Sequence, residues 1–167
     1  MHDSQGKAVF LCKELGVTYL HKDVGERYTF CVESYKKLAA RVKNTIRWVT
    51  RNIHGLRFED KPDDMPQDQL SDVLHLIQAI GFTESGRKAL AFKGGICERD
   101  ALYSAGIPCY DLESVGCPKF SSLLDMYDVK SNITCGLHRY NNPGVVVHCP
   151  VTETMFFRRW LLQEEYE

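Results

Sequence analysis

Apolar and polar positions alternate along the first part of the chain, and this alternation predicts an antiparallel β-hairpin. Between residues 8 and 20 the apolar side chains recur at every second position, with a break at Lys13. A shorter apolar run covers residues 27–32, and the polar stretch 22–26 between the two runs is typical of a turn. We therefore expect two neighbouring antiparallel strands.

A helical spacing replaces the alternation after the hairpin. From residue 38 to residue 53 the apolar side chains recur every three or four positions, which predicts an amphipathic helix. Ser34 is the expected N-cap, and Gly55 is the expected terminating residue. A second helix is predicted from Leu70, with its end at Gly81.

The second half of the chain predicts a βαβ unit. Residues 88–93 and 107–112 are short apolar runs typical of strands, and residues 96–105 between them fit a helix. The strands of such a unit are parallel and its crossover is right-handed. Short and terminal helices are predicted at 118–124 and 152–163. The fold class is therefore α/β, with a mixed sheet in which an antiparallel hairpin is followed by a parallel βαβ unit with flanking helices.

Composition sets the size and the broad class of the protein. The 167 residues suit a single domain over residues 1–167, and 44% hydrophobic with 26% charged residues is an ordinary globular balance. A net charge of −1 argues against a uniformly basic nucleic-acid binder but permits a local basic face. The absence of a long apolar run predicts no membrane association. Seven cysteines without an export signal favour an intracellular location, in cytoplasm or nucleus.

One group of thiols and imidazoles carries the sharpest chemical signal. Cys135 and His138 form a C-x2-H step, and His148 with Cys149 returns ten residues later. Thiolate and imidazole are the ligands that tetrahedral zinc prefers. Three or four of these residues therefore predict a structural zinc site, and the metal-free alternative is two unrelated thiols and two polar histidines.

The fourth ligand is open on the sequence alone. Neighbouring residues rarely both face one ion, so His148 beside Cys149 is an alternative ligand rather than a first choice. Asp3 is a carboxylate candidate if it ends a first strand close to the terminal helix. Glu14 is the remaining carboxylate candidate, although a Lys-Glu pair is more often only surface.

A basic stripe is the second chemical feature. Six cations lie on one side of the first predicted helix, and most such stripes are only solvated surface. They can also contact the phosphates of single-stranded RNA, and we name Lys37, Lys43 and Arg47 as the candidate nucleic-acid contacts. The six residues are Lys36, Lys37, Arg41, Lys43, Arg47 and Arg51.

Short segments spread over the chain resemble the exonuclease-derived, ribonuclease-H-like domains that have lost their nuclease motifs. The nearest family is the Maelstrom domain of the piRNA pathway, together with related uncharacterised arthropod and viral proteins. The resemblance implies a ribonuclease-H-like fold and zinc bound by a Glu-Cys-His-Cys set, with Cys135, His138 and Cys149 as ligands and Asp3 where the family has Glu. The segments are Asp3-Ser4-Gln5-Gly6, Lys13-Glu14-Leu15, Asn52-Ile53-His54-Gly55-Leu56, Phe92-Lys93-Gly94-Gly95, Gly116-Cys117-Pro118-Lys119, Cys135-Gly136-Leu137-His138 and His148-Cys149.

The chain lacks some of the carboxylates that active nucleases of this kind use. Two-metal hydrolysis needs several converging carboxylates, and the Asp-x-Glu of active relatives is reduced here to Asp3-Ser4-Gln5. We therefore expect a catalytically degenerate module that binds RNA or a protein partner in a small-RNA or other nucleic-acid pathway. One alternative is a 3′–5′ exonuclease that uses Asp3, Glu14, His148 and Glu153 with Mg²⁺ or Mn²⁺. Another is a metal-free protein-interaction domain.

Overall fold

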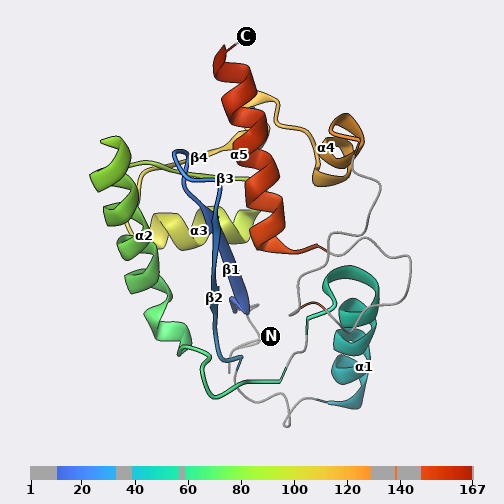
Figure 1. Ribbon diagram of the computed structural model, residues 1–167. Helices are drawn as coiled ribbons and strands as arrows, with labels where there is room; N and C mark the ends of the chain where they lie inside the picture. The colour runs from blue at the N-terminus through green and yellow to red at the C-terminus, as the bar shows by residue number, and fades with distance from the viewer. Residues whose placement is uncertain (1–10, 33–38, 57–58, 129–137, 139–147, 167) are drawn as a thin grey trace.

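The protein is a mixed α/β structure. The computed structural model describes residues 11–32, 39–56, 59–128, 138 and 148–166 (Figure 1). In that part of the chain the strands are β1 (Glu14–Thr18), β2 (Gly25–Thr29), β3 (Leu90–Phe92) and β4 (Cys109–Asp111). The α-helices are α1 (Ala40–Val49), α2 (Leu70–Ser85), α3 (Ile96–Ser104), α4 (Phe120–Met126) and α5 (Pro150–Tyr166), and a π-helical turn, Thr50–His54, continues α1.

Strands β1 and β2 form the antiparallel hairpin that the alternating pattern predicts. Leu15 pairs with Tyr28 in the register, and both side chains pack against the same apolar core. The second strand begins two residues earlier than expected and ends at Thr29, and the next residue, Phe30, still donates a backbone hydrogen bond of 3.0 Å to Lys13 while it forms a parallel bridge with Met65. Residues 8–10 of the first predicted strand lie outside the described residues.

Strands β3 and β4 form the parallel pair of the predicted βαβ unit. The turn into α3 passes through Gly94 and Gly95, whose φ angles of 47° and 122° lie in the left-handed region that favours glycine. One carboxylate oxygen of Asp111 accepts hydrogen bonds from the backbone N–H groups of Gly94 (2.8 Å) and Glu113 (2.9 Å). These bonds tie the end of β4 to the start of the crossover helix.

The predicted single mixed sheet is not what the described residues form. They build two separate two-stranded sheets, one from β1 and β2 and the other from β3 and β4. Side chains join the two sheets instead of backbone hydrogen bonds: Leu15 and Leu90 both pack against one buried cluster, formed by Leu74 of α2, Leu102 of α3 and Ile107. The two sheets are therefore held together by apolar side-chain packing and not by strand pairing.

Glycines end the first two helical segments, although not always at the predicted place. Gly55, with φ of 60°, ends the α1 segment as expected, while the predicted N-cap, Ser34, lies outside the described residues. The expected end of α2 at Gly81 is wrong, because the helix continues to Ser85 and closes at Gly86 with φ of 70°. One internal glycine costs a helix only about 1 kcal/mol, and the apolar contacts of α2 with the hairpin outweigh that cost.

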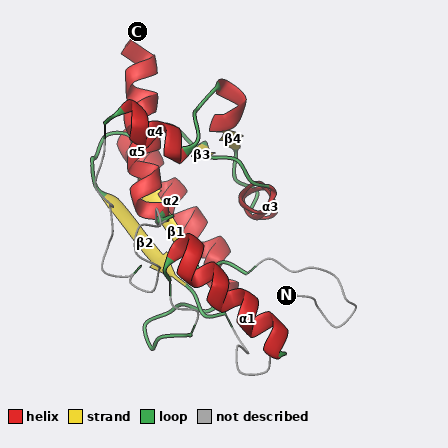
Figure 2. Ribbon diagram, turned by 90° about the vertical axis from the view of Figure 1, so that its right-hand side faces the viewer, coloured by secondary structure: helices red, strands yellow, loops and turns green. Residues whose placement is uncertain are grey.

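Helix α5 lies along the hairpin and, on another side, against α4 (Figures 1 and 2). Thr18 and Thr154 share a hydrogen bond of 2.8 Å, and Arg158 Nε donates to the carbonyl oxygens of Tyr19 (3.1 Å) and Leu20 (2.9 Å). The predicted terminal helix is present, and its apolar side packs into a second core in which Trp160 is buried. The N-terminal end of α5 is thereby held beside β1. None of the helices in the described segments is long and apolar enough to cross a membrane.

Candidate metal centre

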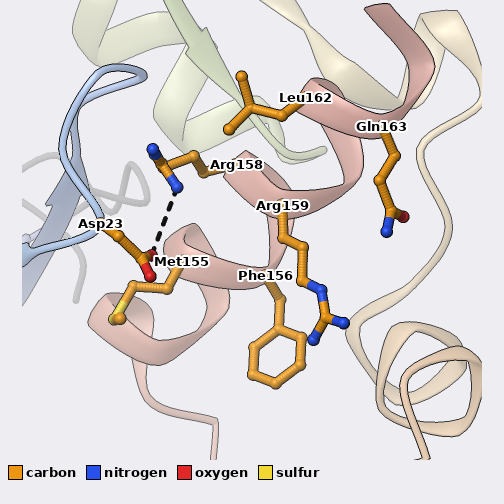
Figure 3. Close-up of a pocket in the computed structure, with 7 residues that line it drawn as sticks. All are labelled: Asp23, Met155, Phe156, Arg158, Arg159, Leu162 and Gln163. Atoms are coloured by element: carbon orange, nitrogen blue, oxygen red, sulfur yellow. Dashed lines mark hydrogen bonds and ion pairs between the residues drawn. The ribbon is translucent and has the colours of Figure 1, made fainter. Parts of the chain in front are cut away.

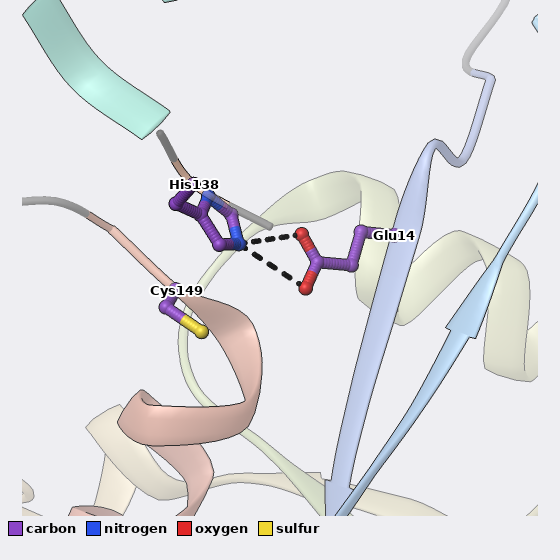
Figure 4. Close-up of side chains that lie close together, drawn as sticks. All are labelled: Glu14, His138 and Cys149. Carbon is purple, nitrogen blue, oxygen red and sulfur yellow. Dashed lines mark hydrogen bonds and ion pairs between the residues drawn. The ribbon is translucent and has the colours of Figure 1, made fainter. Parts of the chain in front are cut away.

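Three side chains from distant parts of the sequence converge beside β1. Glu14 comes from the first position of that strand, and His138 and Cys149 come from the region before α5 (Figure 4). Their ligand atoms all lie within 4.8 Å of one another. His138 Nε2 lies 2.9 Å from Oε2 and 3.3 Å from Oε1 of Glu14. In the described part of the chain, no other group of three or more His, Cys, Asp or Glu side chains converges in this way.

The cluster is deeply buried. Cys149 is 0% exposed and His138 is 1% exposed, and only 3% of the Glu14 side chain reaches solvent. A carboxylate such as that of Glu14 is almost never buried unless it is paired or bound to a metal, whereas a buried cysteine is common. The burial of the Glu14 side chain therefore requires partners inside the protein, and His138 is one of them.

A glycine allows the two sides of the cluster to meet. Gly16 lies two positions after Glu14, so both residues face the same side of β1. A Cβ atom at Gly16 would lie 2.5 Å from the backbone nitrogen of Val151 and 2.7 Å from the carbonyl oxygen of Pro150. Only a residue without a side chain lets the first turn of α5 approach β1 so closely. That approach brings Cys149, the residue before α5, next to Glu14.

Arg27 supplies the compensating positive charge. Its Nε donates a hydrogen bond of 2.6 Å to Glu14 Oε1, and its Nη2 donates one of 3.3 Å to Cys149 Sγ. Arg27 stands on β2, next to the strand that carries Glu14. One guanidinium thus contacts two of the three clustered side chains, and a charge-assisted contact of this kind favours a carboxylate and a thiolate over their neutral forms.

The electrostatic surroundings keep both acidic groups ionised. Burial raises the pKa of the Cys149 thiol, but hydrogen bonds to His138 and Thr152 outweigh burial and lower the pKa from 9.0 to about 6. Burial also acts to raise the pKa of Glu14, and contacts with His138 and Arg27 hold it below its ordinary value. By contrast, burial and the nearby Glu14 carboxylate raise the pKa of the Cys12 thiol to about 12. Cys149 is therefore poised as a ligand, whereas Cys12 is a neutral core residue.

The donor set fits a zinc ion. Oxygen, nitrogen and thiolate donors are those of tetrahedral zinc sites, whereas calcium and magnesium take oxygen. At metal–ligand distances of about 2.0–2.3 Å, adjacent ligand atoms are roughly 3.3–3.8 Å apart. The three ligand atoms here lie within 4.8 Å of one another, so a bound ion would draw the widest pair together by at most about 1 Å. Oε2 of Glu14 is buried and accepts no hydrogen bond, since its 2.9 Å contact with His138 is not aligned as one. A bound cation would satisfy that oxygen.

The same residues do not make an accessible cysteine nucleophile. A Cys–His–Glu arrangement can in principle form a catalytic triad. A nucleophile must reach its substrate, however, and Cys149 is fully buried against α5 and β1. The geometry therefore favours a ligand role for the thiolate.

The structure places the other sequence-predicted ligands as follows. Asp3 and Cys135 lie outside the described residues. His148 is not in the cluster: its side chain is half exposed, and Nδ1 lies 2.8 Å from Glu153 Oε1. Its backbone N–H donates to the carbonyl oxygen of Ile53 (3.1 Å). His148 and Cys149 thus face different surroundings, as expected for adjacent residues.

Two participants could hardly be singled out from the sequence. Glu14 was the second carboxylate choice, because Lys13-Glu14 resembles an exposed ion pair, yet Lys13 pairs with Asp64 (3.0 Å) and Glu14 faces the cluster. Arg27 was not predicted at all. Its role follows from the hairpin register, which sets Arg27 opposite Gly16, and no local motif signals it.

The predicted nucleic-acid contacts are only partly described. Lys37 lies outside the described residues. Lys43 is half buried on α1, and Arg47 is exposed on the same helix, with Nη1 donating a hydrogen bond to Asn44 Oδ1 (3.1 Å). These two predicted residues do share one helix.

A hollow beside α5 contains two arginine side chains, Arg158 and Arg159. Figure 3 shows Arg158 extended toward Asp23, with Nη1 and Oδ1 3.4 Å apart. The neighbouring guanidinium of Arg159 lies 3.9 Å from the centre of the Tyr127 ring. Both cations are thus engaged in holding the fold. The hollow is lined by Asp23, Met155, Phe156, Arg158, Arg159, Leu162 and Gln163.

Comparison with known proteins adds no further assignment. The sequence matches no protein-family model and no curated protein, and the structure matches no solved structure. The functional argument therefore rests on the chain's own geometry.

Proposed function

We propose that the protein is a zinc-stapled, catalytically degenerate ribonuclease-H-like module that binds RNA or a protein partner. The observation that supports the proposal most strongly is the buried cluster of Glu14, His138 and Cys149. The mixed α/β class and the position of the cluster between the first hairpin and the terminal helix support it, whereas the two separate two-stranded sheets of the described residues do not form the single mixed sheet of that fold. Cys135, three residues before His138, is the fourth ligand in this proposal.

The zinc would act as a structural staple. Glu14 belongs to the hairpin, and His138 and Cys149 belong to chain more than a hundred residues further on. Ligands so distant in sequence meet only in the folded state, so metal binding energy becomes folding energy. Arg27 would balance part of the negative charge that two thiolates and a carboxylate bring to one divalent ion. With Cys135 as a fourth protein ligand the zinc site would be closed, and a closed site suits a structural and not a catalytic ion.

The metal-dependent nuclease is the weaker alternative. Two-metal hydrolysis requires carboxylates that converge on a pair of cations. The Glu14 carboxylate is already engaged by His138 and Arg27, and in the described segments it does not converge with His148 and Glu153. The proposal therefore assigns the module to binding.

Metal analysis of the purified protein tests the zinc staple. We expect one zinc per chain, with X-ray absorption showing both sulfur at about 2.3 Å and nitrogen or oxygen at about 2.0 Å. Cys149→Ser and Glu14→Gln should each lose zinc or bind it at least tenfold more weakly. Cys117→Ser is the matched control: it also alters a buried cysteine, but one that lies in the core of α4 and α5.

The control separates loss of metal from loss of packing. Cys117→Ser should lower stability and keep one zinc per chain. Zinc absent from the parent protein, or equal zinc in the parent and in Cys149→Ser, would refute the staple. Loss of zinc in Cys117→Ser alone would place the metal elsewhere.

A further inference from the structure

Helix α1 concentrates positive charge in a protein that is nearly neutral overall. The net charge of the chain is −1, yet residues 40–54 contain four cations and no acidic residue. Arg41, Arg47 and Arg51 are exposed. In the described structure none of these three arginines forms an ion pair with a carboxylate. Their charge is available to an anionic partner.

An exposed tryptophan lies among these arginines. Trp48 is 60% exposed. At 3.6 residues per turn, positions 41, 44 and 48 lie along one side of the helix, and the apolar positions 42, 46 and 49 lie on the other. Trp48 therefore stands on the charged side, opposite the partly buried Ile46 and Val49, although Val42 on that opposite side is itself 43% exposed. A large aromatic ring in that place contributes little to the core, and its position among the arginines makes it available to a molecule outside the chain.

We propose that the exposed side of α1 binds single-stranded nucleic acid, with Arg41, Arg47 and Arg51 on the phosphates and Trp48 stacked on a base. Guanidinium groups suit phosphate, and an indole face suits any unpaired base. A duplex keeps its bases stacked on one another and offers Trp48 no free base face. An acidic peptide would satisfy the arginines and leave the tryptophan without a partner, so the combination of charge and ring favours the single strand.

The metal centre and this helix are connected. The helical segment that begins with α1 ends in the π-turn Thr50–His54, and the Ile53 carbonyl oxygen there accepts a hydrogen bond of 3.1 Å from the His148 backbone N–H. His148 directly precedes Cys149 of the metal cluster. The inference rests on the proposed function in this respect, because the zinc staple would hold the segment on which the end of the helix is anchored.

Binding to a fluorescein-labelled 15-nucleotide oligouridylate, followed by anisotropy on the zinc-loaded protein, tests the surface. Trp48→Leu should weaken binding about tenfold, since stacking on an aromatic ring is worth about 1–3 kcal/mol per base. Trp48→Phe, which keeps an aromatic ring, should recover part of the loss. Binding of the unlabelled oligonucleotide should quench the intrinsic tryptophan fluorescence of the parent. Trp48→Leu should show no such quenching, because its one remaining tryptophan is the buried Trp160.

Salt dependence separates phosphate contacts from other contacts. Each phosphate neutralised on a single strand contributes a slope of about −0.7 in log K against log salt. Replacing Arg41, Arg47 and Arg51 together by Gln should therefore reduce the slope by about 2. The matched control replaces three cations elsewhere, Arg87, Lys88 and Arg99, by Gln, and it should leave affinity and slope close to those of the parent.

The outcomes separate this proposal from the zinc staple. Absent binding at low salt, equal loss in the two triple variants, or preference for a 15-base-pair RNA duplex would each overturn the single-strand surface. Binding to anionic phospholipid vesicles without binding to the oligonucleotide would overturn it as well. If zinc content and melting temperature are normal in a parent that does not bind, the α1 proposal fails and the zinc staple stands.

Discussion

Gly16 is a position at which the structure has no room for a side chain. Replacing Gly16 by Ala adds one methyl group, whose carbon would lie 2.5 Å from Val151 N and 2.7 Å from Pro150 O. Both neighbours are backbone atoms in the first turn of α5, so no side-chain rotation can relieve the contact. Relative to an optimum of about 3.5 Å, the helix must move by about 1 Å.

The expected size of the effect follows from that displacement. Overpacking of this kind typically costs about 1–3 kcal/mol. For a chain of this length each kcal/mol lowers the melting temperature by about 2–4 °C. Because the displaced turn follows Cys149 directly, the thiolate should also move away from Glu14 and His138. We therefore expect zinc affinity to fall together with stability.

Gly81→Ala provides the matched control. A Cβ at Gly81 would meet the Tyr19 ring at an ordinary 3.9 Å, and an alanine inside α2 should be neutral or stabilising by up to about 1 kcal/mol. The measurement is urea unfolding of both variants, with a competitive zinc titration of each. If Gly16→Ala is as stable as Gly81→Ala and binds zinc as tightly as the parent, the close approach of α5 to β1 does not exist.

Two further predictions concern the chemistry of the cluster. In metal-free protein the free energy of unfolding should increase with pH from about 6 to about 9, because over that range Cys149 is a thiolate when folded and a thiol when unfolded. That stability should be lost as the pH falls through 6, and Cys149→Ser should flatten the urea-unfolding profile over the whole range. A separate expectation is that the protein has no two-metal nuclease activity, so Asp3→Ala and Glu153→Ala should leave any trace of labelled-RNA degradation unchanged. A Mn²⁺-dependent activity that both substitutions abolish would contradict the degenerate-exonuclease proposal.

Local sequence determined the elements of this fold. The period-two alternation near Leu15 and the glycine turn before α3 each act within a few residues, so the hairpin and the βαβ unit could be predicted without the tertiary structure. The end of α2 could not, because Gly81 is a helix breaker by propensity and is overruled by packing of the helix against the hairpin. The prediction of one mixed sheet was wrong for the described residues, because the two strand pairs meet through side chains, with Leu15 and Leu90 both packed against the buried cluster that contains Leu74.

Some residues of the metal cluster could likewise be predicted from the sequence, and others could not. The sequence alone could name His138 and Cys149, because thiolate and imidazole at short spacing are a local signal of zinc. Only the tertiary structure could choose Glu14 over other carboxylates and add Arg27, because both choices depend on the register of β1 with β2 and on the approach of α5 at Gly16. The chemistry of a side chain depends on the residue type alone. Its partners depend on backbone segments that meet only after the chain has folded.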